Sequence, residues 1–258
     1  MNELAIFAGA GGGILGGKLL GWRTVCAVER NAYAAQVLAQ RQNNGILEPF
    51  PIWSDVQNFD GKPWKGIVDV ISGGFPCQDI SVAGKGVGID GEQSGMWKHM
   101  ARIIGEVRPR FVFVENTPLL VSRGLVRILS DLACMGFDAK WGIMGASDAG
   151  LCHNRKRFWL VANTNGYRLQ RINSVSSAKA HQPRSTQWSD IARVVSEVQQ
   201  GGENCIPESW ILRDSNGLAN RMDRTVAIGN GQVPAVAARA WNILNCGRGN
   251  SANSAARR

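Results

Sequence analysis

The sequence predicts an α/β protein whose β-sheet is mostly parallel. Short apolar runs alternate with segments of helical periodicity over the first 162 residues, which is the pattern of strands joined by crossover helices. A glycine-rich turn comes directly after the first apolar run, and a cysteine and a glutamate follow two later runs. Ligands meet such sheets at the carboxyl ends of the strands. The predicted sheet therefore gathers chemically functional residues at one edge.

Each element is predicted from its local pattern. Short apolar runs rich in β-branched and aromatic residues predict strands, and apolar residues spaced by three or four predict helices. The predicted strands are 3–8, 23–29, 66–73, 110–114, 139–145 and 158–162. The predicted helices are 31–42, 96–107, 122–135 and 234–245, together with the segment from the glycine turn to Leu20.

The composition changes after Ala162. Residues 163–215 are rich in Asn, Gln, Ser and Arg and show weak periodicity, whereas 221–246 return to an ordered pattern. We expect one main domain formed by 1–162 and 216–246, interrupted by a small irregular region at 163–215. The tail 247–258 is small and polar, which predicts disorder.

The charge of the chain is concentrated in its second part. The 29 basic and 20 acidic side chains give a formal charge of +9. Residues 1–150 carry 14 of each sign, so the excess lies in 151–258, and within this part 163–220 contributes only +1. Such a distribution indicates a polyanionic partner that binds around the main domain. An ordinary soluble protein with an uneven surface charge has the same distribution of basic and acidic residues.

The spacing of the cysteines and the hydropathy of the chain indicate the cellular compartment in which the protein acts. The six cysteines form no C-x-x-C pair and the three histidines do not cluster with them, which disfavours a zinc site and a disulfide framework. The amino terminus has no basic segment before its apolar run, which disfavours a signal peptide. No apolar run reaches the roughly 18 residues that span a bilayer. We expect a reducing, cytoplasmic setting without membrane contact.

The first motif is the glycine turn from Phe7 to Gly12, which follows the first predicted strand. Glycines there let the backbone approach a ligand closely. Glu29 ends the next predicted strand, about 20 residues on, where an acid bonds a ribose hydroxyl. By itself the motif fits a nicotinamide, flavin or S-adenosylmethionine (AdoMet) site, or a tight structural turn.

The second motif places Cys77 directly after a predicted strand, in the sequence Gly74-Phe75-Pro76-Cys77-Gln78. A cysteine at a strand end is a candidate nucleophile when its pKa is lowered. The polar, glycine-dense stretch 83–95 that follows is a candidate lid over a substrate. An ordinary surface loop has the same composition.

Two further motifs follow later strands. Glu115-Asn116 ends the strand at 110–114, where a carboxyl group is a candidate acid–base or hydrogen-bonding group. Arg155 and Arg157 alternate before the strand at 158–162 and therefore share a face. Two guanidinium groups on one face suit a phosphate or a carboxylate.

Together and in this order, these motifs resemble the DNA cytosine-5 methyltransferase family. Phe7-Ala8-Gly9-Ala10-Gly11-Gly12 resembles its AdoMet motif, and Pro76-Cys77-Gln78 its nucleophile motif, the most specific of the set. Glu115-Asn116-Thr117 resembles E-N-V with Thr for Val, and the segment 153–157 resembles Q-x-R-x-R with His for Gln. Arg224 and 229–234 resemble the late motif that completes the cofactor pocket.

The resemblance implies a Rossmann-like AdoMet-methyltransferase sheet and assigns roles to the motifs. Cys77, Glu115, Arg155 and Arg157 are the implied catalytic residues, and Gln78, Ser81 and Asn116 contact the substrate. The implied cofactor is AdoMet, and no metal is required. The implied cofactor-binding residues are Phe7, Ala8, Gly9, Ala10, Gly11, Gly12, Glu29, Asp55, Val56, Gly74, Pro76, Met96, Asn230 and Gly231.

The same resemblance places target recognition in 163–215, a region that is short for this family. A short module indicates a short site in double-stranded DNA. Its candidate contacts are Arg168, Arg171 and Arg184, with the aromatic residues Tyr167 and Trp188 beside them. We expect a monomer, and a cognate restriction endonuclease is a candidate partner.

Three alternatives stay open at this point. The substrate of the same fold can be RNA, with tRNA as the example. The chain can be a non-catalytic DNA-binding relative, against which Cys77, Glu115 and the two arginines argue. A nicotinamide-dependent oxidoreductase with a catalytic cysteine explains the glycine turn but not the basic second half.

Overall fold

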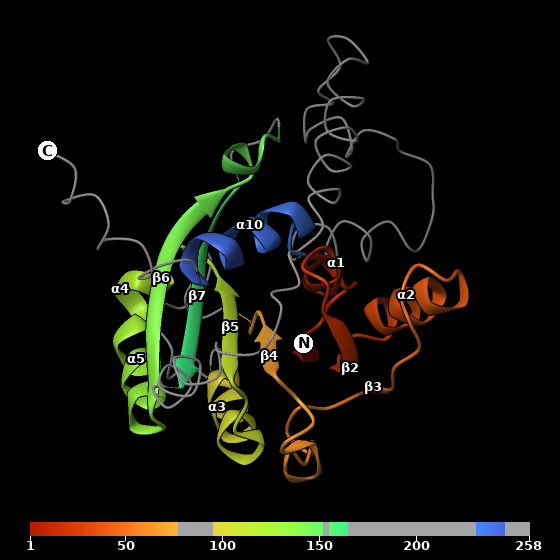
Figure 1. The fold of residues 1–258 in the computed structure, drawn as a ribbon, viewed down its shortest axis with the longest axis horizontal. Helices are drawn as coiled ribbons and strands as arrows, with labels where there is room; N and C mark the ends of the chain where they lie inside the picture. The colour runs from red at the N-terminus through yellow and green to blue at the C-terminus, as the bar shows by residue number, and fades with distance from the viewer. Residues whose placement is uncertain (77–94, 152–154, 165–230, 246–258) are drawn as a thin grey trace, which may run out of the picture.

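The computed structural model describes residues 1–76, 95–151, 155–164 and 231–245. They form a seven-stranded sheet with helices on both faces, in the strand order β3-β2-β1-β4-β5-β7-β6 (Figure 1). The first five strands of this order are parallel, and β7 is antiparallel to both β5 and β6. The prediction of an α/β protein with a mostly parallel sheet is confirmed.

The elements have the following bounds. The strands are β1 Asn2–Ile6, β2 Arg23–Val28, β3 Ile52–Trp53, β4 Val70–Gly73, β5 Phe111–Asn116, β6 Phe137–Gly145 and β7 Lys156–Thr164. The helices are α1 Gly12–Leu19, α2 Ala32–Asn43, α3 Met96–Val107, α4 Leu120–Arg123, α5 Leu125–Cys134 and α10 Pro234–Asn245. Two short 3-10 turns span Lys62–Trp64 and Ser147–Ala149.

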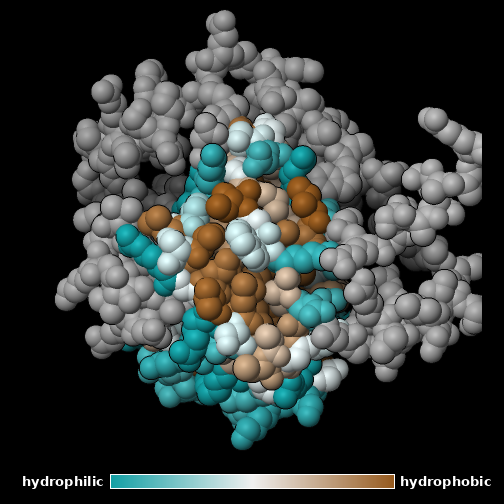
Figure 2. All heavy atoms as spheres, turned by 90° about the vertical axis from the view of Figure 1, so that its left-hand side faces the viewer, coloured by the Kyte–Doolittle hydropathy of each residue, from teal (hydrophilic) through white to brown (hydrophobic). Residues whose placement is uncertain are grey.

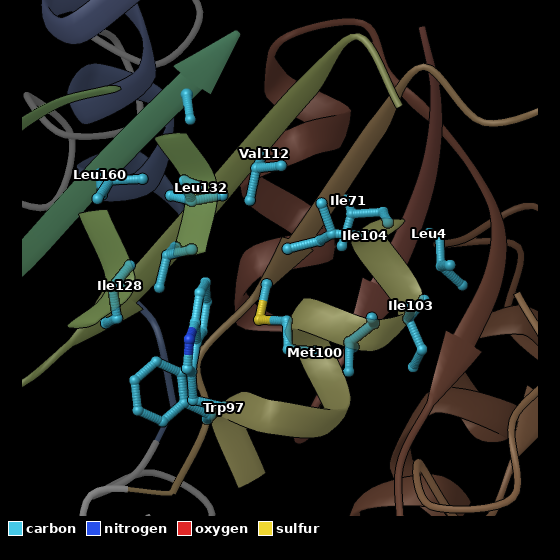
Figure 3. Close-up of a cluster of buried hydrophobic side chains, with 14 of the residues drawn as sticks. Leu4, Ile71, Trp97, Met100, Ile103, Ile104, Val112, Ile128, Leu132 and Leu160 are labelled. Carbon is cyan, nitrogen blue, oxygen red and sulfur yellow. The ribbon is translucent and has the colours of Figure 1, made fainter. Parts of the chain in front are cut away.

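One face of the sheet is covered by α3 and α5. Alternate residues of a strand point to opposite faces, and Leu4, Ile71 and Val112 of the central strands belong to the core cluster on this side. Figure 3 shows side chains of α3 and α5 meeting these strand residues. The helical contributors are Trp97, Met100, Ile103, Ile104, Ile128 and Leu132, all nearly inaccessible to solvent.

The opposite face is covered by α1, α2 and α10. Trp241 of α10 packs edge-on against Trp22, with ring centroids 4.6 Å apart, and against Phe113, at 5.5 Å. Helix α10 also packs tightly on α1, because a Cβ added at Gly16 would lie 2.8 Å from the Cβ of Ala237. The segment at the end of the described chain is therefore an integral layer of the domain.

Most strand boundaries differ from the sequence prediction by one or two residues, and the strand predicted at 66–73 begins only at Val70. The first strand ends at Ile6, because Phe7 has a positive φ of 54° that no strand continues. The predicted helix 122–135 is divided into α4 and α5 at Gly124, whose extended φ of 178° interrupts the helical hydrogen bonds. The two-residue strand β3 was not predicted, because two residues carry no periodicity.

Of the range 163–215 and the tail 247–258, the structure describes only the first two residues of the range. Strand β7 continues to Thr164, two residues into the range 163–215. The rest of that range and the tail 247–258 lie outside the described residues, so the predicted domain division stays a prediction. Among the helices in the described part, none combines the length and apolar character needed to cross a membrane.

The β6 edge of the sheet has an apolar surface. Figure 2 looks onto this side of the molecule, and hydrophobic residues gather at its centre within a more polar rim. Trp141 and Ile143 of β6 are 42% and 46% exposed. Trp141 stacks on Phe158 of the neighbouring strand β7, with ring centroids 5.8 Å apart, so part of this surface belongs to the sheet packing.

A buried acid links the three neighbouring strands β2, β1 and β4. Glu3 of β1 is inaccessible to solvent and accepts hydrogen bonds from Thr24 Oγ1 at 2.7 Å and from Ser72 Oγ at 2.6 Å. Burial raises the pKa of Glu3, and the two hydroxyl groups lower it less. A raised pKa in the folded state means that the folded protein binds this proton more tightly than the unfolded chain. Stability then falls as the pH rises above about 4.5.

We predict that Glu3→Gln raises the melting temperature at pH 8, because an amide keeps both hydroxyl partners and has no charge to desolvate. Each kcal/mol gained corresponds to about 2–4 °C in a protein of this size. The gain should disappear at pH 4, where Glu3 is protonated in both states. Thermal unfolding followed by circular dichroism measures it. Glu48→Gln is the control, because Glu48 is 73% exposed. A variant that melts below the wild type at pH 8 contradicts this account.

Candidate active site

A large cavity formed by the described residues lies at the carboxyl edge of the parallel strands. Its volume is about 840 Å³, and it is lined by residues that directly follow β1, β2 and β4 and by the end of β5. Most of the site residues predicted from the sequence and present among the described residues meet here. They are Phe7, Ala8, Gly9, Ala10, Glu29, Asp55, Val56, Gly74, Pro76, Met96, Glu115, Asn116 and Gly231.

The glycine turn forms one wall of this cavity and is held by Glu29. The backbone N–H of Gly9, a glycine with a φ of 55°, donates to Glu29 Oε2 at 2.6 Å. The other carboxylate oxygen, Oε1, accepts from the backbone N–H of Asn31 at 2.7 Å. Asn31 in turn caps α2 by accepting from the N–H of Ala34. The carboxylate therefore fixes the turn to the start of α2 while it lines the cavity.

Gly11 and Gly12 belong to the same turn but pack against protein. Gly11 has a φ of 86°, and a Cβ there would lie 2.6 Å from Leu38 Cδ2 of α2. A Cβ at Gly12 would lie 2.1 Å from the carbonyl oxygen of Gln232. Neither residue is part of the cavity wall that the described residues form. Their glycine character is required for close packing, and their contact with a cofactor stays a prediction.

Two arginines that sequence reasoning missed hold the walls in place. Arg41 of α2 donates to the carbonyl oxygen of Ala10 at 2.6 Å. Arg102 of α3 donates to the carbonyl oxygens of Val56 and Phe59, each at 2.9 Å, and forms an ion pair with Glu106 at 2.7 Å. A basic residue on a helix gives no sequence signal for such a contact, because the acceptors are backbone carbonyls on distant segments.

Glu115 is the central ionisable group of the site. It is 8% exposed and lies on β5, and its Oε1 forms an ion pair with Nε of Arg157 at 3.0 Å. Burial raises the pKa of Glu115 to about 7, against the lowering effects of Arg157, Arg155 and a hydrogen bond from the side chain of Gln232. The carboxyl group is therefore poised to hold or release a proton near neutral pH.

Asn116 holds the backbone that leads to Cys77. Its Nδ2 donates to the carbonyl oxygen of Phe75 at 3.1 Å, and its Oδ1 accepts from the backbone N–H of Thr117 at 2.8 Å. Phe75 is buried, and Pro76, the residue directly before Cys77, lines the cavity. Asn116 therefore fixes Phe75 and Pro76, the last described residues before Cys77, beside the end of β5.

Several predicted site residues lie outside the described residues. They are Cys77, Gln78, Ser81, Asn230, Arg168, Arg171 and Arg184. Arg155 is described and acts on Glu115 electrostatically together with Arg157. The predictions for the seven undescribed residues stay predictions.

Comparison with known proteins decides the family. A family model described as C-5 cytosine-specific DNA methylase matches residues 1–231. The chain belongs to this family. It is similar to the type II methyltransferase M.PspPI of Psychrobacter sp. (strain TA137), with 35% identity over 49% of this chain and 31% of the relative. It is also similar to M.CviJI of Paramecium bursaria Chlorella virus IL3A, with 30% identity over 66% of this chain and 45% of the relative.

A third similar protein is the type II methyltransferase M.NgoMIV of Neisseria gonorrhoeae, with 32% identity over 64% of this chain and 53% of the relative. The chain thus spans about a third to a half of the length of these relatives. Among solved structures, a DNA modification methyltransferase encoded within an Escherichia coli prophage has a TM-score of 0.53 at 23% identity, over 65% of this chain and 48% of its own. Dnmt2 of S. pombe has a TM-score of 0.52 at 18% identity, over 64% and 50%. These structures support the fold.

We predict that Arg157→Met raises the pKa of Glu115 above its value of about 7, because the ion pair stabilises the ionised carboxylate. The titration is measured by NMR on protein labelled with ¹³C at glutamate carboxyl groups, and Glu115→Gln identifies the resonance. Arg127→Met is the matched control, since Arg127 forms its ion pair with Asp131 on the surface of α5. A Glu115 titration that is unchanged or lowered in Arg157→Met contradicts the assignment.

Proposed function

We propose that this protein transfers a methyl group from AdoMet to carbon 5 of a cytosine in double-stranded DNA. Membership of the C-5 cytosine-specific DNA methylase family supports this reaction class. The observation that carries the proposal is the buried Glu115–Arg157 ion pair, because Glu115 lines the same cavity as Pro76, the residue before Cys77 in the sequence. A proton donor and a cysteine nucleophile are the two groups that activation of a cytosine ring requires.

The size and lining of the cavity support AdoMet as the cofactor. Its volume of about 840 Å³ is sufficient for a nucleoside with an amino-acid arm. Phe7 and Val56 offer apolar surface for the adenine, and Glu29 offers carboxylate oxygens to the ribose hydroxyls. The turn at Gly9 and the segment at Gly231 would hold the methionine end. When bound, AdoMet supplies an electrophilic methyl group.

The protein side chains make the cytosine reactive. The thiolate of Cys77 adds to ring carbon 6, and the electron pair of the carbon 5–carbon 6 double bond shifts to give an enamine that is nucleophilic at carbon 5. Protonated Glu115 donates its proton to the ring nitrogen, which neutralises the negative charge that the addition generates. After methylation, carbon 5 loses its proton and the bond to Cys77 breaks, which restores the aromatic ring.

The arginines and the segment after Cys77 would position the base. A cytosine inside a duplex is inaccessible, so it must be flipped out at a cost of a few kcal/mol. Arg157, already paired with Glu115, would contact the ring oxygen, and Arg155 the phosphate. Gln78, Ser81 and the stretch 83–95 would close over the flipped nucleotide.

We assign recognition of the DNA sequence to residues 163–215. This range is nearly neutral, whereas the arginine motif and the returning segment carry most of the excess charge. Backbone affinity should therefore be salt-sensitive and independent of sequence, and Arg168, Arg171 and Arg184 are the proposed contacts within the reading region. The relatives named as type II methyltransferases make a restriction endonuclease a proposed partner, and we propose a monomeric enzyme.

We predict that expression in a host lacking cytosine methylation produces 5-methylcytosine at one short DNA motif, because the protein would flip out a cytosine only within the DNA sequence that it recognises. Bisulfite sequencing of host DNA measures it and reports the recognition sequence. Cys77→Ala should abolish the signal, because no other group adds to carbon 6. Cys134→Ala is the control, since Cys134 is exposed on α5.

The outcomes of this experiment separate the alternatives. Methylation retained in Cys77→Ala refutes the nucleophile assignment. Unmodified DNA alongside newly methylated cytosines in cellular RNA would make RNA the substrate. Unmodified DNA and RNA, with an active control enzyme, would refute the proposed reaction.

We predict that the protein binds AdoMet and does not bind NAD, and that Gly12→Ala weakens AdoMet binding by tenfold or more. The added Cβ would lie 2.1 Å from the carbonyl oxygen of Gln232, so the segment that brings Gly231 to the cavity must shift. Isothermal titration calorimetry measures both affinities. Gly105→Ala is the control, because its Cβ meets Met135 Sδ at an ordinary 3.7 Å. Binding of NAD instead would favour the oxidoreductase, and unaltered binding by Gly12→Ala would refute the role of this contact.

A further inference from the structure

We propose that Gln232 is a positioning residue that orients the carboxyl group of Glu115 for proton transfer to the cytosine ring. The sequence gives Gln232 no role of its own beyond its place in the late motif. The structure puts its side chain between the glycine turn and Glu115. The catalytic part of this inference rests on the proposed function, whereas the contact with Glu115 does not.

The backbone of Gln232 is fixed by α1. Its carbonyl oxygen lies so close to Gly12 that no side chain fits between them. The helix α10 begins at Pro234 and packs on α1, with Ala237 against Gly16. Gln232 therefore enters the site from a rigid support, and its side chain has a defined direction.

The amide of Gln232 lies between two glycines. A Cβ at Gly13 would lie 2.5 Å from Gln232 Oε1, and a Cβ at Gly74 would lie 3.2 Å from Gln232 Nε2. The same Cβ at Gly74 would lie 2.6 Å from Glu115 Oε2. The amide nitrogen and the carboxylate thus face the same small space above Gly74, where the side chain of Gln232 donates a hydrogen bond to Glu115.

Glu115 is consequently held from two directions. Arg157 of β7 contacts Oε1 at 3.0 Å, and Gln232 approaches from the segment before α10. A carboxyl group held by two donors on separate elements cannot rotate freely about its last bond. Gln232 and Gly231 also form part of the wall between the main cavity and a small cavity beside Arg155, Arg157 and Trp159. The hydrogen bond from Gln232 therefore restrains Glu115 at the boundary between the proposed cofactor cavity and the side chains of Arg155 and Arg157.

The neutral amide suits this role. Among the described charged groups, Arg157 and Arg155 act on the carboxyl of Glu115, and both favour its ionised form. Burial opposes them and is the largest influence, so the pKa stays near 7. A third positive charge would oppose burial further and favour the ionised carboxylate at neutral pH. Gln232 adds a directional hydrogen bond without a full charge and leaves Glu115 able to carry the proton that it donates.

Gln232→Met tests the proposal, because methionine has a similar length and donates no hydrogen bond. The pKa of Glu115 should rise, as measured by ¹³C NMR of the free protein with Glu115→Gln as the assignment reference. In steady-state methyl transfer to DNA, kcat should fall about tenfold, as expected for a misoriented catalytic group, and by a larger factor than KM for AdoMet changes, since Gln232 also lines the cavity. The alkaline limb of the pH profile of kcat/KM should move to higher pH, because the proton donor is lost at a higher pH.

A second variant and a control complete the test. Gln232→Glu places a second carboxyl group beside Glu115 and should raise its pKa further than Gln232→Met does. Gln40→Met is the matched control, because Gln40 pairs with Asn44 on the exposed surface of α2. This substitution should change neither the pKa of Glu115 nor kcat.

An unchanged Glu115 titration in both Gln232 variants overturns the proposal. So does a loss of kcat in Gln232→Met with an unmoved alkaline limb, since that indicates a structural role. The NMR measurement uses the free protein and does not depend on turnover. It therefore tests the contact even if the wild-type protein methylates no cytosine, a result that would refute the proposed function alone.

Discussion

The buried ion pair between Glu115 and Arg157 is the interaction on which the rest of the site depends. It joins β5 to β7, the two strands where the sheet changes from parallel to antiparallel. Glu115 keeps a pKa near 7 because burial outweighs the two arginines. An isolated buried carboxylate would be too costly, and an exposed one would be fully ionised at neutral pH. The pairing of these two strands thus produces a buried carboxyl group that can hold or release a proton near neutral pH.

A second constraint joins the two ends of the described chain. The glycine turn at the start of α1 admits the backbone of Gln232 because Gly12 and Gly13 have no side chains. This contact, with the packing of α10 on α1, brings Gly231 and Gln232 into the cavity formed by β1, β4 and β5. The cavity wall and the support of Glu115 are therefore built from the same segment, and a change in one is transmitted to the other through Gln232.

Much of the fold could be predicted from local pattern. The runs that became β1, β2, β4 and β5 are apolar, and the long helices α2, α3 and α10 were placed within a residue or two. Two of the errors arose where a single residue decides the backbone, at Phe7 with its positive φ and at Gly124. Arg41 and Arg102 could not be predicted, because they bind backbone carbonyls that only folding brings near them.

The sequence by itself determined the family, the order of the motifs and the class of sheet, because these depend on residue types and on their spacing along the chain. Only the tertiary structure decided what each residue contacts. It showed that Gly11 and Gly12 pack against Leu38 and Gln232, that Arg157 is paired with Glu115, and that burial sets the pKa of that acid. Burial and long-range contact arise from segments that are distant in sequence, and no local pattern encodes them.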